Sequence, residues 1–271
     1  MSKIRRIASG RAFLAADIVG QGQPVVLLHS NAGDRREWQA AMGCLGTDHQ
    51  VIAYDRRGFG ETQAEREDHS AVEDLTAVLD AVTEGKPAVL VGCSMGGKIA
   101  LDAALRYPAR VRGLVLIAPS VEGAPAPDYS PEVAEMVAWA QAAEASGDPT
   151  RTAAAKARLW LDGPLAPEGR VGGAPRRLFL DMIGIALSAP AVGANLDRTP
   201  AYGRLGTITV PTFVIQGDLD FPHIQARSRH IAETVPGGSL HELTDVAHLP
   251  ALERPDVLAD LISNFLAQHL G

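Results

Sequence analysis

Three side chains of this sequence could together turn a hydroxyl group into a nucleophile: Ser94, Asp220 and His248. A serine hydroxyl is a weak nucleophile until a base takes its proton, and that base must be held in place by a third group. In chain order, the three residues supply a serine, an acid and a histidine, each placed after a separate predicted strand. This arrangement predicts acyl transfer through a covalent intermediate.

Ser94 stands in the pattern Gly-Cys-Ser-Met-Gly at residues 92–96, directly behind the apolar run 88–91. Glycines two residues before and two after the serine suit a sharp turn from strand to helix, because a Cβ there would clash where the two elements meet. Such a turn strains the serine backbone and pushes the hydroxyl out above the sheet, at the positive end of a helix. The pattern favours a nucleophile at this position.

Other residues compete for the acid and histidine roles. Asp218 lies two residues before Asp220 and is expected to close the turn. Glu122, beyond the fourth buried strand, is an alternative orienting acid. His223 precedes the next helix and comes too early in the chain to complete the order.

Short apolar runs, typical of buried strands, alternate along the chain with helical patterns. This alternation predicts an α/β fold with a mostly parallel central sheet and helices on both faces. The expected strands are an edge strand at 11–19, then 25–28, 51–54, 88–92, 114–118, 211–215 and 239–243. The expected helices are 37–45, 70–82, 95–106, 224–235 and 255–269. His29, Asp55 and Ser94 all follow predicted strands, at the sheet edge where ligands gather in such folds.

The strand pattern stops between residues 121 and 200, where alanine-rich helical segments take over. We expect a helical insertion over the edge of the sheet, which divides the chain into a first core part (1–120), the insertion (121–200) and a second core part (201–271). Its large apolar side chains are Met136, Trp139, Trp160, Phe179 and Met182. Trp139, Trp160 and Phe179 are candidates for lining a substrate pocket, and the alternative is that they pack the insertion onto the core.

Composition excludes several classes of protein. A net charge of −7 argues against a nucleic-acid surface. We expect no membrane contact and a cytoplasmic location, because no apolar segment follows the basic start and no run approaches the length of a membrane span. Cys44 and Cys93 lie in different predicted elements, so no disulfide framework is expected. The expected partner is a small molecule, self-association into a homo-oligomer stays open, and we predict no cofactor and no metal.

Taken together, these motifs resemble the α/β-hydrolase fold family, in its branch of serine esterases and lactonases with a helical cap. The resemblance covers nearly the whole chain except the insertion. The motifs that carry it are the strand and loop from Leu27 to Trp38, the turn 54–60, the elbow 92–97, the acid turn 217–220, and the histidine loop 247–250 with Glu253 and Pro255.

This resemblance implies a role for each site residue. Ser94 is then the nucleophile, His248 the general base and acid, and Asp220 the residue that orients His248. The backbone N–H groups of Met95 and Asn31 would form the oxyanion hole. The insertion would be the cap that shapes the acyl or leaving-group pocket.

The sequence departs from the family pattern at Ser30, where a glycine usually follows the histidine of the oxyanion strand. A side chain there is expected to narrow the loop, and His29 and Ser30 are further candidates for substrate contact. Ser30-Asn31, with the later Gly33 and Trp38, resembles the corresponding loop of enol-lactone hydrolases, which favours lactones. The Asn31 side chain could also donate to a substrate or serve as a turn residue.

Several functions share this set of residues. The first hypothesis is hydrolysis of a small or medium carboxylic ester or lactone. The second is hydrolytic C–C cleavage of diketo ring-cleavage products, with Arg56 or an arginine of residues 151–177 facing a substrate carboxylate. Perhydrolysis uses the same triad, and a catalytically silent receptor for a small molecule is a third hypothesis. Haloalkane dehalogenases and epoxide hydrolases of this fold use an aspartate where this chain has Ser94.

Overall fold

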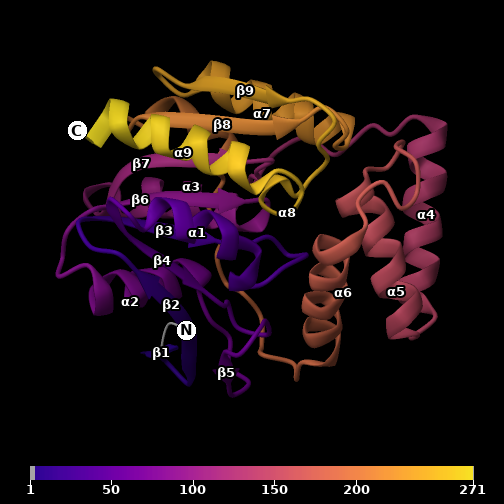
Figure 1. The fold of residues 1–271 in the computed structure, drawn as a ribbon, viewed down its shortest axis with the longest axis horizontal. Coiled ribbons are helices and arrows are strands. Elements are labelled where there is room, and N and C mark those ends of the chain that lie inside the picture. The colour runs from indigo at the N-terminus through magenta and orange to yellow at the C-terminus, as the bar shows by residue number, and fades with distance from the viewer. Residues whose placement is uncertain (1–3, 271) are drawn as a thin grey trace.

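A computed structural model describes residues 4–270 (Figure 1). Its centre is a nine-stranded sheet in the order β1-β2-β4-β3-β6-β7-β8-β9, with β5 paired to β2. The strands are β1 (Arg5–Ser9), β2 (Ala12–Val19), β3 (Gln23–Leu28), β4 (His49–Tyr54), β5 (Gln63–Ala64), β6 (Ala88–Cys93), β7 (Val111–Ile117), β8 (Thr212–Gly217) and β9 (Ser239–Leu243).

The sheet is mostly parallel, as the sequence predicts. Strands β4, β3, β6, β7, β8 and β9 all run in one direction. The prediction of an edge strand at 11–19 is wrong, because β2 lies inside the sheet, antiparallel to both β1 and β4. The edge is β1, which the sequence analysis missed. Ile7 is the one fully buried residue of β1, so the segment lacks the apolar run or alternation that marks a strand.

Helices cover both faces of the sheet (Figure 1). Their bounds are α1 (Gln39–Leu45), α2 (Ala71–Val82), α3 (Met95–Arg106), α7 (Pro222–Thr234), α8 (Pro250–Glu253) and α9 (Pro255–Leu270), with 3-10 turns at Arg35–Trp38, Pro108–Arg110 and Tyr202–Thr207. One apolar cluster joins the strands to α2, α3 and α7, and a second joins them to α1 and α9. The start of α2 follows from Ser70, whose side chain accepts a hydrogen bond from Glu73 N.

The register of the central strands brings their carboxyl ends to one edge. Leu28 at the end of β3 lies opposite both Tyr54 of β4 and Gly92 of β6. The residue or two after each strand end therefore share that edge, and they include His29, Asp55 and Ser94. Every residue of β6 is buried, as expected for a parallel strand covered on both faces.

Beyond this edge lie the helices of the insertion (Figure 1). They are α4 (Pro131–Ala145), α5 (Pro149–Lys156), a π-helical turn at Ala157–Asp162, and α6 (Gly173–Ser188). We call residues 131–188 the cap. Its helices begin at side-chain caps where the sequence offers them, such as Ser130 before α4 and Asp148 before α5.

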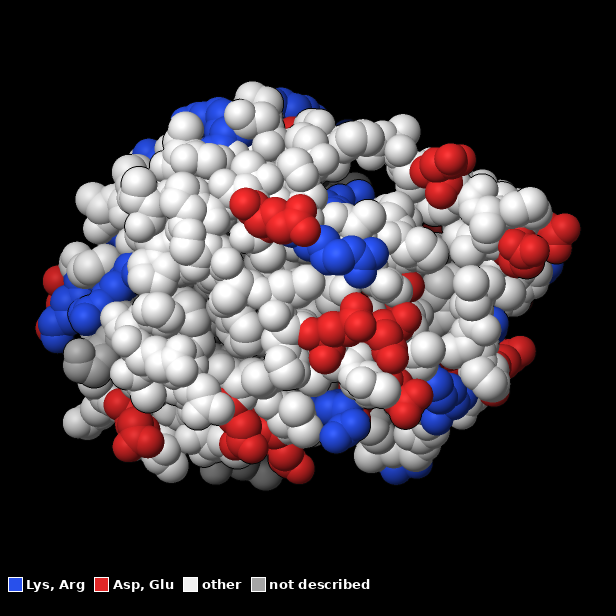
Figure 2. Space-filling model, turned by 90° about the horizontal axis from the view of Figure 1, so that it is seen from above, with Lys and Arg blue, Asp and Glu red and all other residues white. Residues whose placement is uncertain are grey.

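None of the helices in residues 4–270 combines the length and the hydropathy needed to cross a bilayer. On the face seen in Figure 2, basic side chains stand in small groups separated by uncharged or acidic surface. The two cysteines are unbonded, with Cys93 buried and Cys44 exposed.

Candidate active site

Ser94 occupies a strained turn between β6 and α3. Its φ of 52° and ψ of −110° lie outside the regions that side chains readily adopt. Three backbone hydrogen bonds hold it there. Ser94 N donates to Ile117 O at 2.9 Å, and Ser94 O accepts from Lys98 N at 3.1 Å and from Ser120 N at 3.0 Å. Strain of this kind persists only where the surroundings over-determine the backbone, and it marks functional sites.

The two glycines of the elbow are required by contact, as the sequence analysis predicts. A Cβ on Gly96 would lie 2.1 Å from the carbonyl oxygen of Leu28, at the end of the neighbouring strand β3. A Cβ on Gly92 would lie 2.4 Å from the carbonyl oxygen of Gly96. Larger residues would force α3 away from the sheet and move Ser94 with it.

His248 and Asp220 form a buried pair at the ends of two later segments. His248 Nδ1 lies 2.7 Å from Asp220 Oδ2, and the other carboxylate oxygen accepts from Phe221 N at 2.7 Å. Because Nδ1 is engaged, Nε2 is the ring nitrogen available to a serine hydroxyl. The Cys93 thiol, adjacent to Ser94, contacts the carbonyl oxygen of His248 at 3.6 Å. The elbow and the histidine loop therefore lie side by side.

The competing residues are engaged elsewhere. Glu122 lies 3.5 Å from the Lys98 ammonium, and Asp218 accepts from Val246 N at 3.4 Å, which holds the turn. The His223 ring packs edge-on against Phe221, with ring centres 5.4 Å apart. Within residues 4–270, Asp220 is the one carboxylate paired with His248.

Two hydrogen bonds to the carbonyl oxygen of Ser30 fix the orientation of the peptide between Ser30 and Asn31. Ser30 O accepts hydrogen bonds from His29 Nδ1 at 2.7 Å and from Arg56 Nη2 at 2.8 Å. Because the peptide is planar and trans, the Asn31 N–H must point the opposite way. Neither Asn31 N–H nor Met95 N–H has an acceptor among the described residues. Both donors are free to meet a developing oxyanion.

Contacts with Arg56 fix the tautomer of His29. The backbone N–H of Arg56 donates to His29 Nε2 at 3.0 Å, so Nε2 carries the lone pair and Nδ1 carries the proton. Burial, together with the adjacent Arg56 charge, holds the pKa of His29 well below its ordinary value. Neutral His29 can therefore donate to Ser30 O throughout the physiological range.

His29 and Ser30, which the sequence analysis took as candidates for substrate contact, are fully buried. The Ser30 hydroxyl donates to Glu37 Oε2 at 2.8 Å and accepts from Ala32 N at 3.1 Å. The Ser30 hydroxyl is therefore engaged within the loop itself, and substrate contact by His29 or Ser30 stays a prediction. Both residues hold the loop in shape.

Glu37, which the sequence analysis overlooked, lies beneath this loop. Burial raises the pKa of its carboxyl group to about 7, although two hydrogen bonds from Ser30 act in the opposite direction. Its Oε1 has no hydrogen-bond partner among the described residues. No pattern in the sequence marks Glu37, because its partner Ser30 is brought to it only by the folded loop.

The cap reaches the site through Trp160. This side chain belongs to the π-helical turn, an irregularity that is frequent at functional sites. Its ring centre lies 4.7 Å from that of His248 and 4.9 Å from that of Phe221. Phe179 is fully buried in the apolar cluster that joins cap and core, so packing accounts for it. Trp139 is 41% exposed and lines a different pocket, on α4, so the structure does not bring it to this group.

A network from the cap also holds the histidine loop. Glu253 accepts from Ala247 N at 3.0 Å and from Leu249 N at 3.2 Å, on either side of His248. Arg170 of the cap forms an ion pair with Glu253 and donates to Asp245 O at 2.9 Å. The pairing of Arg170 with Glu253 could not be predicted from the sequence, because this contact joins segments far apart in the chain.

The arginines at 170 and 176 were both among those considered for a substrate carboxylate. Arg170 is paired with Glu253, and Arg176 with Asp162. Arg56 differs from them, because it contacts Ser30 O, Asn31 Oδ1 and the Phe59 ring and has no carboxylate partner in the described part of the chain. Burial lowers the pKa of Arg56 to about 10, so the side chain is still cationic at neutral pH.

No three His, Cys, Asp or Glu side chains within residues 4–270 come together in a way that could hold a metal ion. What the arrangement offers is a strained serine, a histidine held by a carboxylate, and two free N–H groups.

The sheet order, the serine elbow and the histidine loop define an α/β-hydrolase. A model of the Alpha/beta hydrolase family matches residues 25–261, and the chain belongs to this family.

Two curated relatives with different names are similar to this chain over most of its length. The biotin biosynthesis bifunctional protein BioHC of Teredinibacter turnerae is 27% identical over 268 residues, which cover 90% of this chain and 45% of that protein. This chain therefore spans about half of that relative. The 2-hydroxymuconate semialdehyde hydrolase of Pseudomonas sp. strain CF600 is 29% identical, over 96% of this chain and 94% of that protein.

Two solved structures are similar over nearly their whole length. A thermophilic esterase from Thermogutta terrifontis is 25% identical, with a TM-score of 0.78 and 99% of each chain covered. Est816, described as an N-acyl homoserine lactone degrading enzyme, is 26% identical with a TM-score of 0.70, over 96% of this chain and 99% of that one.

Proposed function

We propose that this protein is a serine hydrolase that cleaves a small or medium carboxylic ester or lactone through an acyl-enzyme on Ser94. The observation that carries the proposal is the strained serine at the start of α3, beside a histidine whose Nδ1 lies 2.7 Å from Asp220. A hydroxyl in this position has both a base and oxyanion donors within its surroundings.

In the first half of the reaction, Ser94 Oγ attacks the acyl carbon and its proton passes to His248 Nε2. The carbonyl oxygen becomes an oxyanion and receives hydrogen bonds from the N–H groups of Met95 and Asn31. When the tetrahedral intermediate collapses, the bond to the leaving oxygen breaks and His248 returns the proton to that oxygen. A lactone ring opens in the same step and stays attached through its acyl end.

In the second half, a water molecule attacks the acyl-enzyme while His248 takes its proton. Collapse of the second intermediate returns the proton to Ser94 Oγ and releases the carboxylic acid. Asp220 stabilises the imidazolium that forms in each half, and it keeps the Nδ1–H tautomer of His248 in place. Each oxyanion donor contributes about 3–4 kcal/mol to such steps.

Arg56 and His29 act on this reaction without touching the reacting atoms. By donating to Ser30 O, they fix the plane of the peptide whose N–H faces the oxyanion. Hydrogen bonds to a carbonyl also polarise the N–H of the same peptide, which strengthens its donation. We propose both as positioning residues.

Support for an ester or lactone comes from two sources. The loop at Ser30 and Asn31 resembles that of enol-lactone hydrolases, and the similar solved structures include an esterase and a lactone-degrading enzyme. Trp160 against His248 gives the site an aromatic wall on the side of the cap, which suits an apolar acyl or alkyl group.

A burst-phase assay with p-nitrophenyl esters of graded acyl length, on wild type and Ser94→Ala, tests the proposal. We expect a burst of p-nitrophenol in the wild type, a length optimum that reports pocket depth, and loss of both in Ser94→Ala. A parallel Ser188→Ala variant, altered at an exposed serine of α6, controls for handling and should retain the burst. Turnover that survives in folded Ser94→Ala would overturn the assignment.

Hydrolytic C–C cleavage is the second candidate. The 2-hydroxymuconate semialdehyde hydrolase aligns over almost the whole chain, and Arg56 has no carboxylate of its own to neutralise it. A dienoic diketo acid turned over far faster than any p-nitrophenyl ester would favour this candidate. Perhydrolysis would appear as peroxyacid formation from an ester and hydrogen peroxide. Tight ligand binding without turnover by the wild type would favour a receptor.

A further inference from the structure

Most arginines with little exposed surface have a carboxylate partner among the described residues. The pairs include Arg35–Asp55, Arg57–Asp74, Arg170–Glu253 and Arg176–Asp162. Two others, Arg56 and Arg158, donate to backbone carbonyl oxygens instead. Arg227 on α7 has neither kind of partner. It is half-buried, and no described residue forms an ion pair or a hydrogen bond with it. Burial lowers the pKa of its guanidinium, which nevertheless remains charged at neutral pH.

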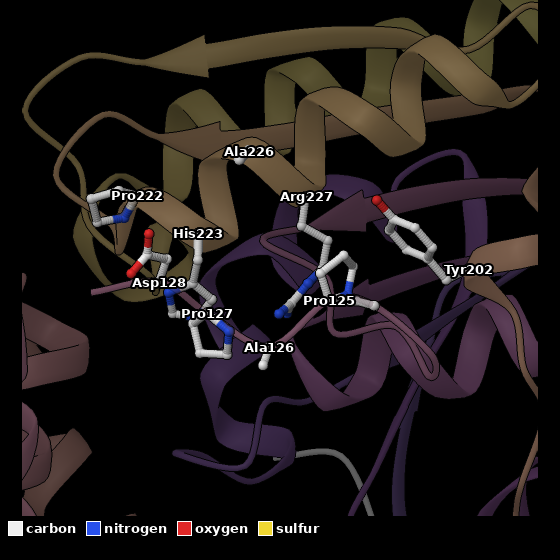
Figure 3. Close-up of a pocket in the computed structure, with 10 residues that line it drawn as sticks. Pro125, Ala126, Pro127, Asp128, Tyr202, Pro222, His223, Ala226 and Arg227 are labelled. Atoms are coloured by element: carbon white, nitrogen blue, oxygen red, sulfur yellow. The ribbon is translucent and has the colours of Figure 1, made fainter. Parts of the chain in front are cut away.

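The Arg227 side chain lines a cavity of about 350 Å³ between α7 and the segment that leaves β7 (Figure 3). His223, Ala226 and Arg227 stand at positions i, i+3 and i+4 of α7, so they share one face of the helix. Figure 3 shows the His223 and Arg227 side chains pointing from α7 toward Pro125 and Pro127. The helix therefore aims both polar groups into the cavity.

The other walls of the cavity are mostly apolar. Pro125 and Pro127 supply rigid rings from the facing segment, and Tyr202 closes the end near Arg227. The Tyr202 ring is fixed by stacking on His230, with ring centres 4.4 Å apart. Apolar walls around one convergent charged group are typical of sites for small organic molecules.

His223 adds a neutral polar group to the cavity. Burial lowers its pKa to about 4, so its imidazole is uncharged at neutral pH. Its Nδ1 is buried without a hydrogen-bond partner among the described residues. Asp128 lies at the His223 end of the cavity and away from Arg227 in Figure 3, so the anionic group of a ligand belongs at the Arg227 end.

We propose that this cavity binds a small organic carboxylate, with its carboxylate on the Arg227 guanidinium and its apolar body between Tyr202 and the two prolines. A guanidinium presents paired N–H donors that match the two oxygens of a carboxylate. The nearby Asp220 carboxylate acts on the charge of Arg227 but forms no ion pair with it. A half-buried cation without an ion-pair partner gains more from a bound carboxylate than an exposed one does. None of Ser94, Asp220 and His248 lines the cavity, so this site does not depend on the proposed hydrolase activity.

Isothermal titration of the 271-residue chain with benzoate tests the proposal, because benzoate combines a carboxylate with a flat apolar ring. Benzamide, which has the same shape without the charge, is the matched control ligand and should bind at least tenfold more weakly. Arg227→Gln should weaken benzoate at least tenfold. Arg229→Gln removes an exposed arginine from the same helix and should leave benzoate affinity unchanged.

A second variant tests the cavity apart from the charge. Ala226 is exposed on α7 and lines the cavity, so Ala226→Leu fills the space without disturbing the core. We expect this variant also to weaken benzoate at least tenfold, with an unchanged thermal midpoint. Benzoate affinity that is unaffected by Arg227→Gln, or absence of binding up to about 10 mM, would overturn the proposal.

Discussion

The core and the cap of this protein differ in how completely their apolar side chains are buried. Strand β6 is completely buried and its neighbour β3 is buried from Pro24 onward, and their ends are aligned by parallel pairing within one sheet. The cap helices leave large apolar side chains at the surface, among them Trp139, Leu180, Ile185 and Leu187. All five residues of the proposed triad and oxyanion hole come from the core, whereas the cap brings Trp160 to the site.

This difference predicts that the core places the reacting groups and the cap shapes the pocket. Groups that must be placed within a few tenths of an ångström belong on rigid elements, while groups that only shape a pocket tolerate looser ones. If this division is correct, substitutions on the core side change kcat, and substitutions on the cap side change KM and the preference for acyl length. Three variants test this expectation and a fourth tests the stability of the core, in order of decreasing effect.

The largest effect is expected for Asp220→Asn. The amide keeps the size of the side chain but cannot stabilise the imidazolium or hold the same tautomer of His248, so kcat should fall by roughly 10⁴-fold with little change in KM. Steady-state kinetics with the preferred p-nitrophenyl ester provides the measurement. Asp218→Asn, on the same turn but not paired with His248, is the matched control, and an equal loss in both variants would refute the role of Asp220.

Arg56→Met should lower kcat by about 10-fold to 100-fold, less than the loss of a whole oxyanion donor, because the Asn31 N–H stays present but loses its alignment. Arg56→Lys should restore part of the loss.

A comparison of each ester with its thionoester gives a readout that a merely structural role would not change. Oxyanion donors prefer oxygen to sulfur, so the ester to thionoester ratio of kcat/KM should fall in Arg56→Met. A ratio equal to that of the wild type would show that Arg56 does not act on the oxyanion peptide.

On the cap side, Trp160→Ala should raise KM about tenfold for the best ester and shift the length optimum toward longer acyl chains. Removing the indole opens space beside His248, while the pair of His248 and Asp220 keeps its hydrogen bond. Trp139→Ala, at an exposed position of the same cap, should leave both values within about twofold. A large fall in kcat without a change in KM would contradict the proposed division between cap and core.

The smallest effect concerns stability. The pKa of Glu37 is raised to about 7 in the folded protein, whereas a glutamate in the unfolded chain titrates near 4.3. Between these values the folded state binds more protons, so the free energy of unfolding falls as pH rises through this window. Glu37→Gln removes this slope.

The thermal midpoint of Glu37→Gln relative to wild type should therefore rise by a few degrees between pH 5 and pH 8. Differential scanning calorimetry at both values provides the measurement. An equal difference at the two pH values would show that Glu37 does not titrate in this range.

Much of the core could be predicted from the sequence because local patterns there agree with the final packing. The helix after Ser94 and the strand at 239–243 have the predicted bounds, since glycine spacing, Tyr107-Pro108 and short apolar runs define their ends. Strand β1 was missed because its neighbours in the sheet, and not its own sequence, make it a strand. The partner of His248 could be predicted from chain order together with the place of Asp220 after a predicted strand.

The residues that hold the site could not be predicted in the same way. Arg170 behind the histidine loop and the hydrogen bond from Arg56 to His29 depend on contacts between segments far apart in the chain. The bond between Ser30 and Glu37 forms only once the loop between them has folded. The sequence shows a polar residue at each position but not what it meets. Trp160 was one of three equal candidates in the cap, and its place against His248 follows from the π-helical turn.

The parallel pair of β7 and β8 gives the chain one more property. These strands are neighbours in the sheet, yet the whole stretch 118–211 lies between them in sequence. A cut at the exposed Gly147, between α4 and α5, would leave Ser94 in one fragment and both Asp220 and His248 in the other. If the proposed triad is correct, we expect the two fragments to be active only when β7 and β8 pair. Coexpressed fragments should regain turnover in proportion to that pairing, and so report the association of any two proteins fused at the cut.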